Sequence, residues 1–187
     1  MVQGLAAGKP WICLKGNHDR MAAGMLKDPD YVSPIKPHVQ WLQPNVGGKE
    51  SVASYGVDVS DGRDFKEIME DARKVVPQSH IDFLSNLQNS YQRGDVFYCH
   101  AGVRPGVALD QQSEDDLLWI RQEFHVSNAD HGALIVHGHT PVDKVTHYGN
   151  RVNIDTGAAY GKALSAVVIE DEEVFQITAS GRQEIAR

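Results

Sequence analysis

The chain has 187 residues, 41% of them hydrophobic, which is enough to bury the core of one domain and too few for two independent domains of ordinary size. Its 18 Lys and Arg side chains against 25 Asp and Glu give a formal net charge of −7. This acidic balance argues against a general nucleic-acid-binding protein, which needs a basic face to neutralise phosphates.

No apolar run approaches the ~20 residues of a membrane span, and the first residues lack the basic and then apolar pattern of a signal peptide. Cys13 and Cys99 each lie in an apolar, strand-like run and are expected to be free thiols of a reducing compartment. A cytoplasmic protein without membrane contact is therefore expected.

The first half of the chain shows helical patterns around one loop rich in Pro and Gly. Apolar residues at three- and four-residue spacing predict an amphipathic helix over residues 64–75, and Pro77 both ends it and begins the next. The pair is expected to form an αα-hairpin that caps the core layers. The other expected elements are a helix at 1–7, a strand at 11–15, a helix at 20–27, and a loop at 28–56 with at most a short helix near 39–42.

From Asp95 onward the pattern is typical of β-strands separated by turns. The expected strands are 96–99, 134–136, 152–154, 164–169 and 174–177, with turns at 149–150 and 171–172. This order predicts an α/β or α+β fold, a layered β-sandwich flanked by helices, as a single domain over residues 1–187.

Polar residues follow three of the apolar runs at their carboxyl ends. Gly16-Asn17-His18-Asp19 follows the first expected strand, His100 follows 96–99, and His137-Gly138-His139 follows 134–136. Open α/β layers place their ligands at the carboxyl ends of strands. Three such ends could converge on one site.

The residue types in these stretches suit a divalent cation. The amide oxygen of Asn17 and the imidazoles of His100 and His139 suit Mn²⁺, Fe or Zn²⁺ better than Ca²⁺, which prefers oxygen ligands. Taken singly, each of these residues is more often structural than a ligand, but the joint pattern favours a metal site. His18 adjoins Asn17 and could give a proton to a leaving oxygen.

In their order, the Gly-Asn-His-Asp, His-Ala-Gly and Gly-His-Thr motifs resemble those of the calcineurin-like metallophosphoesterases. The resemblance is closer to the bacterial and phage branch of the phosphoprotein (Ser/Thr) phosphatases, and it runs from about Trp11 to about Ile169. It includes Trp119-Ile120-Arg121, similar to that branch's Trp-x-Arg element, and the stretch Asn-Ile-Asp-Thr-Gly at 153–157.

The resemblance implies a role for each residue of the motifs. Asn17, His100 and His139 would be protein ligands of the second of two metals, with Mn²⁺ favoured and Fe or Zn²⁺ as alternatives. His18 would be the general acid, and Asp19 the carboxylate that orients it. A helix N-cap is the structural alternative for Asp19, and the two roles are compatible.

Two basic residues are implied in phosphate binding. Arg121 would hold phosphate oxygens with paired hydrogen bonds, and Lys15 would add a second contact. The alternative for Arg121 is a surface salt bridge with Glu123 or Asp116. His137 is expected to support a ligand from behind rather than to bind the metal.

The implied activity is hydrolysis of a phosphomonoester or a dinucleoside polyphosphate by hydroxide held between two metals, with phosphorylated proteins or nucleotides as substrates.

The start of the chain differs from the pattern of the family. Members of the family carry Asp-x-His and Gly-Asp-x-x-Asp-Arg-Gly motifs upstream of Gly-Asn-His, whereas the 15 residues before Gly16 contain neither Asp nor His. The chain is therefore expected to lack its N-terminal motifs, to hold at most one incomplete metal site, to be impaired as an enzyme, and to expose a sheet edge through which it could self-associate.

Two other readings remain open at this point. The first is a non-catalytic relative that binds phosphate or a protein partner. The second is a hydrolase with a single metal held by Asn and His alone, which is disfavoured because three neutral ligands compensate the charge of the cation poorly.

Overall fold

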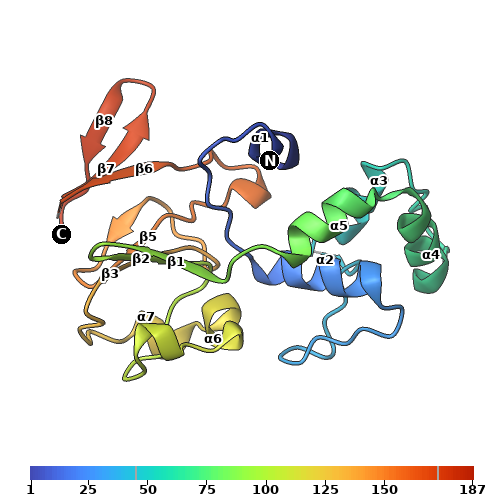
Figure 1. Ribbon diagram of the computed structural model, residues 1–187, viewed down its shortest axis with the longest axis horizontal. Helices are drawn as coiled ribbons and strands as arrows, with labels where there is room; N and C mark the ends of the chain where they lie inside the picture. Colours follow the sequence, from blue (N-terminus) through green and yellow to red (C-terminus); the bar gives the residue numbers. More distant parts are fainter. Residues whose placement is uncertain (45, 172) are drawn as a thin grey trace. The chain divides into compact units, whose positions relative to one another are not determined.

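The computed structural model describes residues 1–44, 46–171 and 173–187. The chain divides into two units, Met1–Gln88 and Asn89–Arg187, and each is described by itself (Figure 1). The first unit is helical, and the second carries both sheets. The expected single domain over residues 1–187 stays a prediction.

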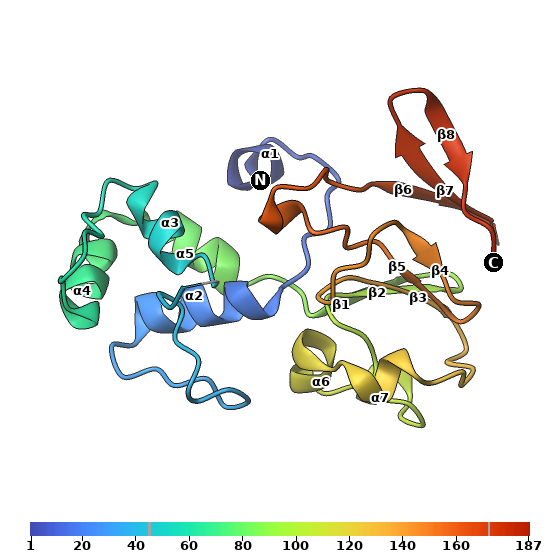
Figure 2. The same cartoon turned by 180° about the vertical axis from the view of Figure 1, so that it is seen from behind.

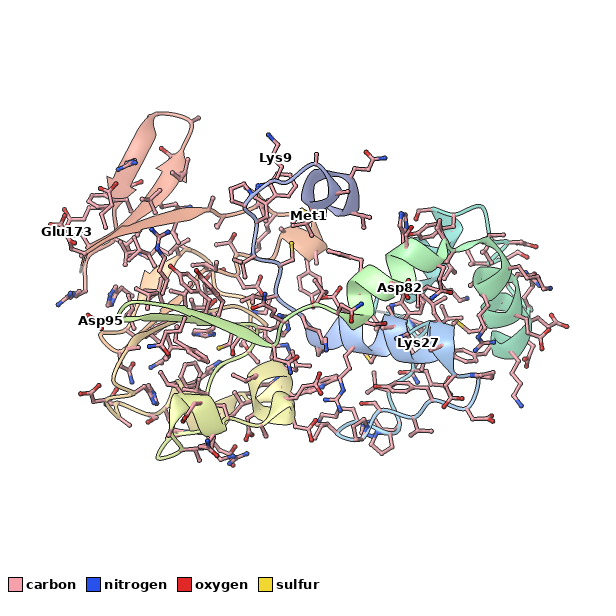
Figure 3. All side chains as sticks on the ribbon, viewed as in Figure 1. Met1, Lys9, Lys27, Asp82, Asp95 and Glu173 are labelled. Atoms are coloured by element: carbon pink, nitrogen blue, oxygen red, sulfur yellow. The ribbon has the colours of Figure 1, made fainter. Side chains whose placement is uncertain are left out.

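Helix α2 (Asn17–Lys27) organises the first unit, because both α4 (Phe65–Val75) and α5 (Gln78–Ser85) pack on it. Its predicted apolar residues Met21, Met25 and Leu26 are all buried. On α5, Ile81 is buried while the next residue, Asp82, is exposed. Figure 3 labels Asp82 on this helix. The helical periodicity therefore identified the buried faces, and two short helices complete the unit: α1 (Val2–Ala6) and α3 (Gly48–Ala53).

The strand expected at 11–15 does not form. Leu14 makes a single parallel bridge to Gln88, and the Lys15 N–H donates to the Gln88 carbonyl at 2.7 Å. Trp11 and Ile12 stay 44% and 47% exposed. An apolar run favours burial but does not supply a neighbouring strand, and a ladder needs one.

The short helix expected near 39–42 is also wrong, because the helix of this segment is α3. It begins after Gly47, whose φ of 84° is left-handed and suits glycine. A Cβ on Gly48 would lie 2.2 Å from the Trp41 carbonyl oxygen, so the chain can approach there only without a side chain. The glycine pair that predicted a loop thus allows a helix to start against Trp41.

The described residues of the second unit form a five-stranded sheet in the order β1-β2-β3-β5-β4 and a three-stranded sheet in the order β6-β7-β8. Strands β2, β3 and β5 run parallel, with Tyr98 opposite Val136 and His137 opposite Asn153. The bounds are β1 (Ser90–Arg93), β2 (Val96–Cys99), β3 (Leu134–His137), β4 (Thr146–His147), β5 (Arg151–Asn153), β6 (Val167–Glu170), β7 (Glu173–Thr178) and β8 (Gly181–Glu184).

The five-stranded sheet lies between helices and the second sheet, as Figure 2 shows from behind. On one face, Phe97 and Ile135 pack with Leu117 and Phe124 of the helical segment, which contains α6 (Glu114–Trp119) and α7 (Gln122–His125). Residues of β3, β5, β6 and β7 pack together on the other face. This arrangement confirms the predicted layered α/β fold. Two single-turn 3₁₀ helices, η1 (Leu109–Gln111) and η2 (Ala158–Tyr160), lie in the connections.

Strand bounds differ from the expectation mainly at the sheet edges. Strand β6 begins at Val167 rather than at residue 164, and Leu164 is 86% exposed. The polar strands β1, β4 and β8 were not expected, since apolar periodicity cannot reveal an edge strand such as β8, whose residues are all exposed. The predicted self-association through a sheet edge stays a prediction, and Glu172 of the expected turn at 171–172 lies outside the described residues.

No helix in the described part of the chain is long and apolar enough to cross a bilayer.

Candidate metal and phosphate site

The parallel pairing of β2 and β3 brings two histidine-bearing loops to the same edge of the sheet. The Gly138 N–H donates to the His100 carbonyl at 2.8 Å, and the Ala101 N–H donates to the Leu117 carbonyl at 2.8 Å. A Cβ on Gly102 would lie 2.2 Å from Phe124 Cδ1, so the loop after His100 can pack on Phe124 only with glycine there. The position of His100 is therefore fixed from both sides.

The imidazoles of His100 and His139 face each other, and their role as two ligands of one ion stays a prediction. His100 Nε2 lies 3.0 Å from His139 Nδ1, and the ring centroids are 4.9 Å apart. Two nitrogens bound at right angles to a cation ~2.1 Å away would be about 3.0 Å apart. The pair therefore fits one edge of a metal coordination shell.

The backbone of His139 is in the left-handed region, with φ at 66°. A non-glycine residue adopts this conformation at a cost, and such residues gather at functional sites. The turn points the His139 ring toward His100, and the Trp119 ring lies against it with centroids 5.9 Å apart and an interplanar angle of 81°.

Arg121 lies between α6 and α7, directly before α7, and its side chain contacts the turn that carries His139. Its Nη1 donates to Thr140 Oγ1 at 3.0 Å, and Thr140 directly follows His139. The alternative salt bridges are taken by another side chain, since Arg104 lies 2.6 Å from an Asp116 oxygen and 3.3 Å from a Glu123 oxygen. The guanidinium of Arg121 is exposed beside the histidine pair, where it could bind an anion.

The other candidate residues lie at the start of α2 in the first unit. Asn17 is its first residue and is 3% exposed, whereas His18 is exposed. Asp19 Oδ2 accepts a hydrogen bond from the Gly16 N–H at 2.7 Å, so Asp19 closes the helix start from its third position rather than as the N-cap itself.

Electrostatics at this helix start are set by burial. Burial raises the pKa of the Asp19 carboxyl, while the Gly16 hydrogen bond and the nearby charges of His18 and Lys15 lower it in part. Gly16 itself has φ at −98°, an ordinary extended conformation.

The structure thus brings His100, His139 and Arg121 together in the second unit, and it places Lys15, Asn17, His18 and Asp19 in sequence at the start of α2 in the first. Within the described residues, no group of three or more His, Cys, Asp or Glu side chains is arranged to hold a metal ion. The imidazole pair on its own therefore provides part of a coordination shell, and a cation there needs further ligands.

Sequence reasoning missed the contribution of Thr140 and Asn153. The Thr140 hydroxyl accepts from Arg121, and its carbonyl accepts from Asn153 Nδ2 at 2.8 Å. Both residues belong to the quoted motifs, so their place in the sequence was a usable signal. Through these two hydrogen bonds, Thr140 and Asn153 hold Arg121, the candidate for phosphate binding, beside the turn that contains His139.

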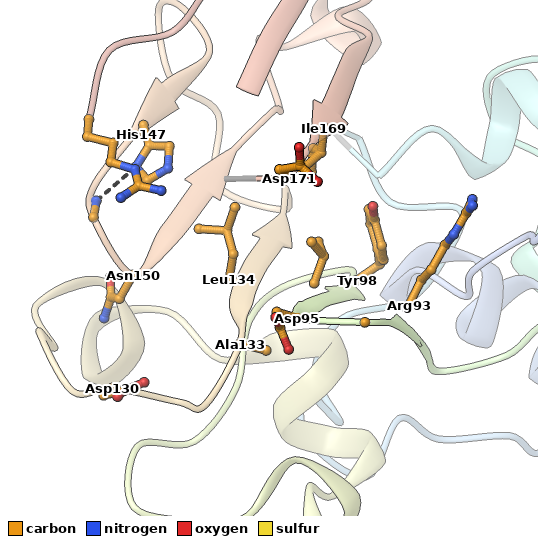
Figure 4. Close-up of a pocket in the computed structure, with 14 residues that line it drawn as sticks. Arg93, Asp95, Tyr98, Asp130, Ala133, Leu134, His147, Asn150, Ile169 and Asp171 are labelled. Carbon is orange, nitrogen blue, oxygen red and sulfur yellow. Dashed lines mark hydrogen bonds between the residues drawn. The ribbon is translucent and has the colours of Figure 1, made fainter. Parts of the chain in front are cut away.

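A cavity of about 1030 Å³ lies elsewhere in the second unit. Its lining includes Val96 and Leu134 at the amino ends of β2 and β3, with Asp95, Arg93 and His147 nearby (Figure 4). The histidine pair lies beyond the carboxyl ends of these strands, so the cavity is a separate feature.

Comparison with known proteins identifies the family of the chain. The family model for calcineurin-like phosphoesterase matches residues 2–168. Over 48 residues the chain is 57% identical to the asymmetrical bis(5′-nucleosyl)-tetraphosphatase PrpE of Geobacillus thermodenitrificans (strain NG80-2) and 42% identical to that of Anoxybacillus flavithermus (strain DSM 21510 / WK1). Each match covers 26% of this chain and 20% of the relative.

A solved structure, that of a mutant cold-active protein tyrosine phosphatase, is similar in fold, with a TM-score of 0.52 and 16% identity. That match covers 98% of this chain and 61% of the solved one, and matches to the curated relatives span only about a fifth of their length. At this identity the likeness concerns the fold alone. Because the family model covers most of the chain, the protein belongs to the calcineurin-like phosphoesterase family.

Proposed function

We propose that the protein acts as a metal-dependent phosphoester hydrolase. The observation that carries the proposal is the 3.0 Å separation between His100 Nε2 and His139 Nδ1, beside an arginine held by the next residue, Thr140. The family normally binds two divalent metals, and a bound divalent cation supplies a Lewis acid and lowers the pKa of water.

The histidine pair would hold one cation, and the amide oxygen of Asn17 is proposed as a third ligand. An amide oxygen with two imidazole nitrogens suits Mn²⁺, and Fe or Zn²⁺ are alternatives. Three neutral ligands leave the charge of a cation poorly compensated. An anionic substrate therefore binds more readily beside it, and carboxylates are needed for a complete site.

Arg121 and Lys15 would bind the phosphoryl group. The guanidinium of Arg121 is planar and can donate two parallel hydrogen bonds to phosphate oxygens, whereas the Lys15 ammonium adds a point charge. Stabilising charge on the phosphoryl oxygens is the main protein contribution to this reaction.

His18 would give a proton to the leaving oxygen. Its exposure suits this role, since a proton donor must reach the substrate. Asp19 is proposed to orient it while it also caps α2.

The proposed substrates are dinucleoside polyphosphates and phosphoserine or phosphothreonine in proteins. The name of the partial relatives, a bis(5′-nucleosyl)-tetraphosphatase, supports the first class. We place the activity in the cytoplasm, in keeping with the free thiols of Cys13 and Cys99. Comparing kcat/KM for diadenosine tetraphosphate and for a phosphothreonine peptide distinguishes the two classes.

The 187 residues alone are expected to hydrolyse p-nitrophenyl phosphate slowly. The reason is the donor set, which contains two imidazoles and an amide but no clustered carboxylates among the described residues. Turnover measured with Mn²⁺ and again with excess EDTA should show a weak, chelator-sensitive rate. Brisk turnover with Mn²⁺ would contradict the incomplete site, and an EDTA-insensitive rate would contradict metal dependence.

A non-catalytic phosphate-binding relative is the second candidate function. The exposed Arg121 beside the histidine pair favours it, because this arrangement can bind an anion without turning it over. Calorimetric titration with orthophosphate in the presence of Mn²⁺, compared with the turnover assay, separates the two functions. Phosphate binding with no hydrolysis of any substrate would favour the second.

A further inference from the structure

His137 lies between the two loops that carry the histidine pair and has no part in the proposed mechanism. It is the last residue of β3, is 2% exposed, and stands opposite Asn153 of β5. Its own carbonyl accepts from the Ile154 N–H at 2.9 Å, which fixes the backbone at this point. Burying a polar imidazole at this position is costly unless it forms hydrogen bonds.

The ring contacts the backbone of both loops. Nδ1 lies 3.2 Å from the Gly138 carbonyl oxygen, and a second backbone hydrogen bond links the ring to Ala101. Ala101 directly follows His100, and Gly138 directly precedes His139. Because a carbonyl can only accept, Nδ1 carries the proton. The ring therefore contacts the backbone of both loops that carry the candidate ligands.

The rest of the ring is packed against other aromatic rings. The Phe124 ring meets it edge-on with centroids 5.0 Å apart, and the His125 ring lies 5.7 Å away. Nε2 is buried without a hydrogen-bond partner among the described residues. Burial lowers the pKa of His137 to about 3, and the charges of His125 and Arg151 lower it further, against the opposing effect of the two backbone hydrogen bonds. The Nδ1–H is directed to the backbone carbonyl of Gly138.

We propose that His137 is a positioning residue whose buried ring, with its Nδ1–H on the Gly138 carbonyl, holds the loops after β2 and β3, so that His100 and His139 keep the spacing that a cation requires. The inference rests on the proposed metal site. A leucine or phenylalanine could fill the same space, but neither could form hydrogen bonds with the backbone of Ala101 and Gly138. Residues behind metal ligands commonly affect metal affinity by about 10- to 100-fold.

Two substitutions separate donation from packing. His137→Phe keeps an aromatic ring against Phe124 but removes the donor. His137→Asn loses ring volume but places an amide N–H at the same number of bonds from the backbone as Nδ1. Far-UV circular dichroism and thermal unfolding identify whether each variant is folded.

The first readout is Co²⁺ binding, followed by its visible absorption and by calorimetry. His137→Phe is expected to lose affinity by about 10- to 100-fold and to change the spectrum, whereas His137→Asn should recover most of the affinity. Wild-type affinity and spectrum in a folded His137→Phe would overturn the proposal. Equal losses in both folded variants would also overturn it, because they would indicate packing.

The second readout needs no metal and keeps the two proposals apart. The Gly138 amide, which donates to the His100 carbonyl, should exchange with solvent about tenfold faster in His137→Phe than in the wild type, as measured by NMR. If the wild-type chain fails to bind Co²⁺, the proposed function is wrong. Faster exchange of the Gly138 amide in His137→Phe would still support the role of His137 in holding the two loops. Unchanged exchange of that amide in a folded His137→Phe would contradict the positioning role of His137, regardless of the result of the Co²⁺ titration.

Discussion

Replacing His139 by alanine is expected to lower the affinity for Mn²⁺ at least about 100-fold. Loss of a residue that merely supports a ligand already costs about 10- to 100-fold, and His139 is proposed to bind the ion directly. The direction of the His139 imidazole is set by the backbone turn at φ 66° and by the Trp119 ring, and an alanine at this position has no nitrogen to offer the cation. Isothermal titration with Mn²⁺ measures the loss, and weak hydrolysis of p-nitrophenyl phosphate should fall with it.

The matched control for this variant is His38→Ala. His38 is an exposed histidine in the first unit, outside all the motifs, and its replacement removes an imidazole that belongs to none of them. Its Mn²⁺ affinity should equal that of the wild type. An equal loss in both variants would show that the titration reports surface histidines, and wild-type affinity in His139→Ala would exclude this residue as a ligand.

Replacing Arg121 by alanine is expected to lower kcat/KM for a phosphoester by about 100-fold or more while leaving Mn²⁺ affinity unchanged. Removing one hydrogen-bond donor aimed at developing charge in an oxyanion hole costs about 10²- to 10³-fold in kcat. Arg121→Lys should fall between the two, because lysine keeps the charge but loses the planar fork. Steady-state kinetics with Mn²⁺ at saturation measure the effect.

Arg182→Ala serves as the control for lost positive charge. Arg182 lies on β8, where its Nη1 is 2.6 Å from a Glu170 oxygen and both side chains are 53% exposed. Such surface pairs contribute little, so stability and kinetics should stay close to those of the wild type. If Arg121→Ala behaves like this control, Arg121 has no role in phosphate binding.

Local patterns predicted the parts of the fold that depend on local periodicity. The helix of residues 64–75 was identified to within one residue at its start, because its apolar spacing and the N-cap Asp64 are both visible in the sequence. The strands that carry His100 and His139 were likewise identified, since each is a short apolar run ending in histidine.

Features that depend on partners could not be predicted in this way. Residues 11–15 are as apolar as a strand, but among the described residues their strand-type pairing is limited to one bridge, between Leu14 and Gln88. Strand β8 has the opposite property, since its polar residues pair with β7 although no periodicity indicates a strand. Pairing depends on residues distant in the sequence, and a local pattern does not contain them.

The candidate site shows the same division. The sequence placed His100 and His139 at strand ends, and the parallel register of β2 and β3 brings these ends together. The sequence could not show that Arg104 pairs with Asp116 and Glu123. Because these carboxylates are paired with Arg104, the Arg121 side chain donates to Thr140 instead. The shared role of Asn17 with the histidine pair stays a prediction, because it joins residues of the two units.

An experimental structure of the chain with bound Mn²⁺ tests the central claim most directly. Anomalous diffraction at the manganese edge should show one ion about 2.1 to 2.3 Å from both His100 Nε2 and His139 Nδ1, with the Asn17 amide oxygen as a further ligand. Manganese bound at another place, or no manganese near these two nitrogens at saturating concentration, would contradict the account.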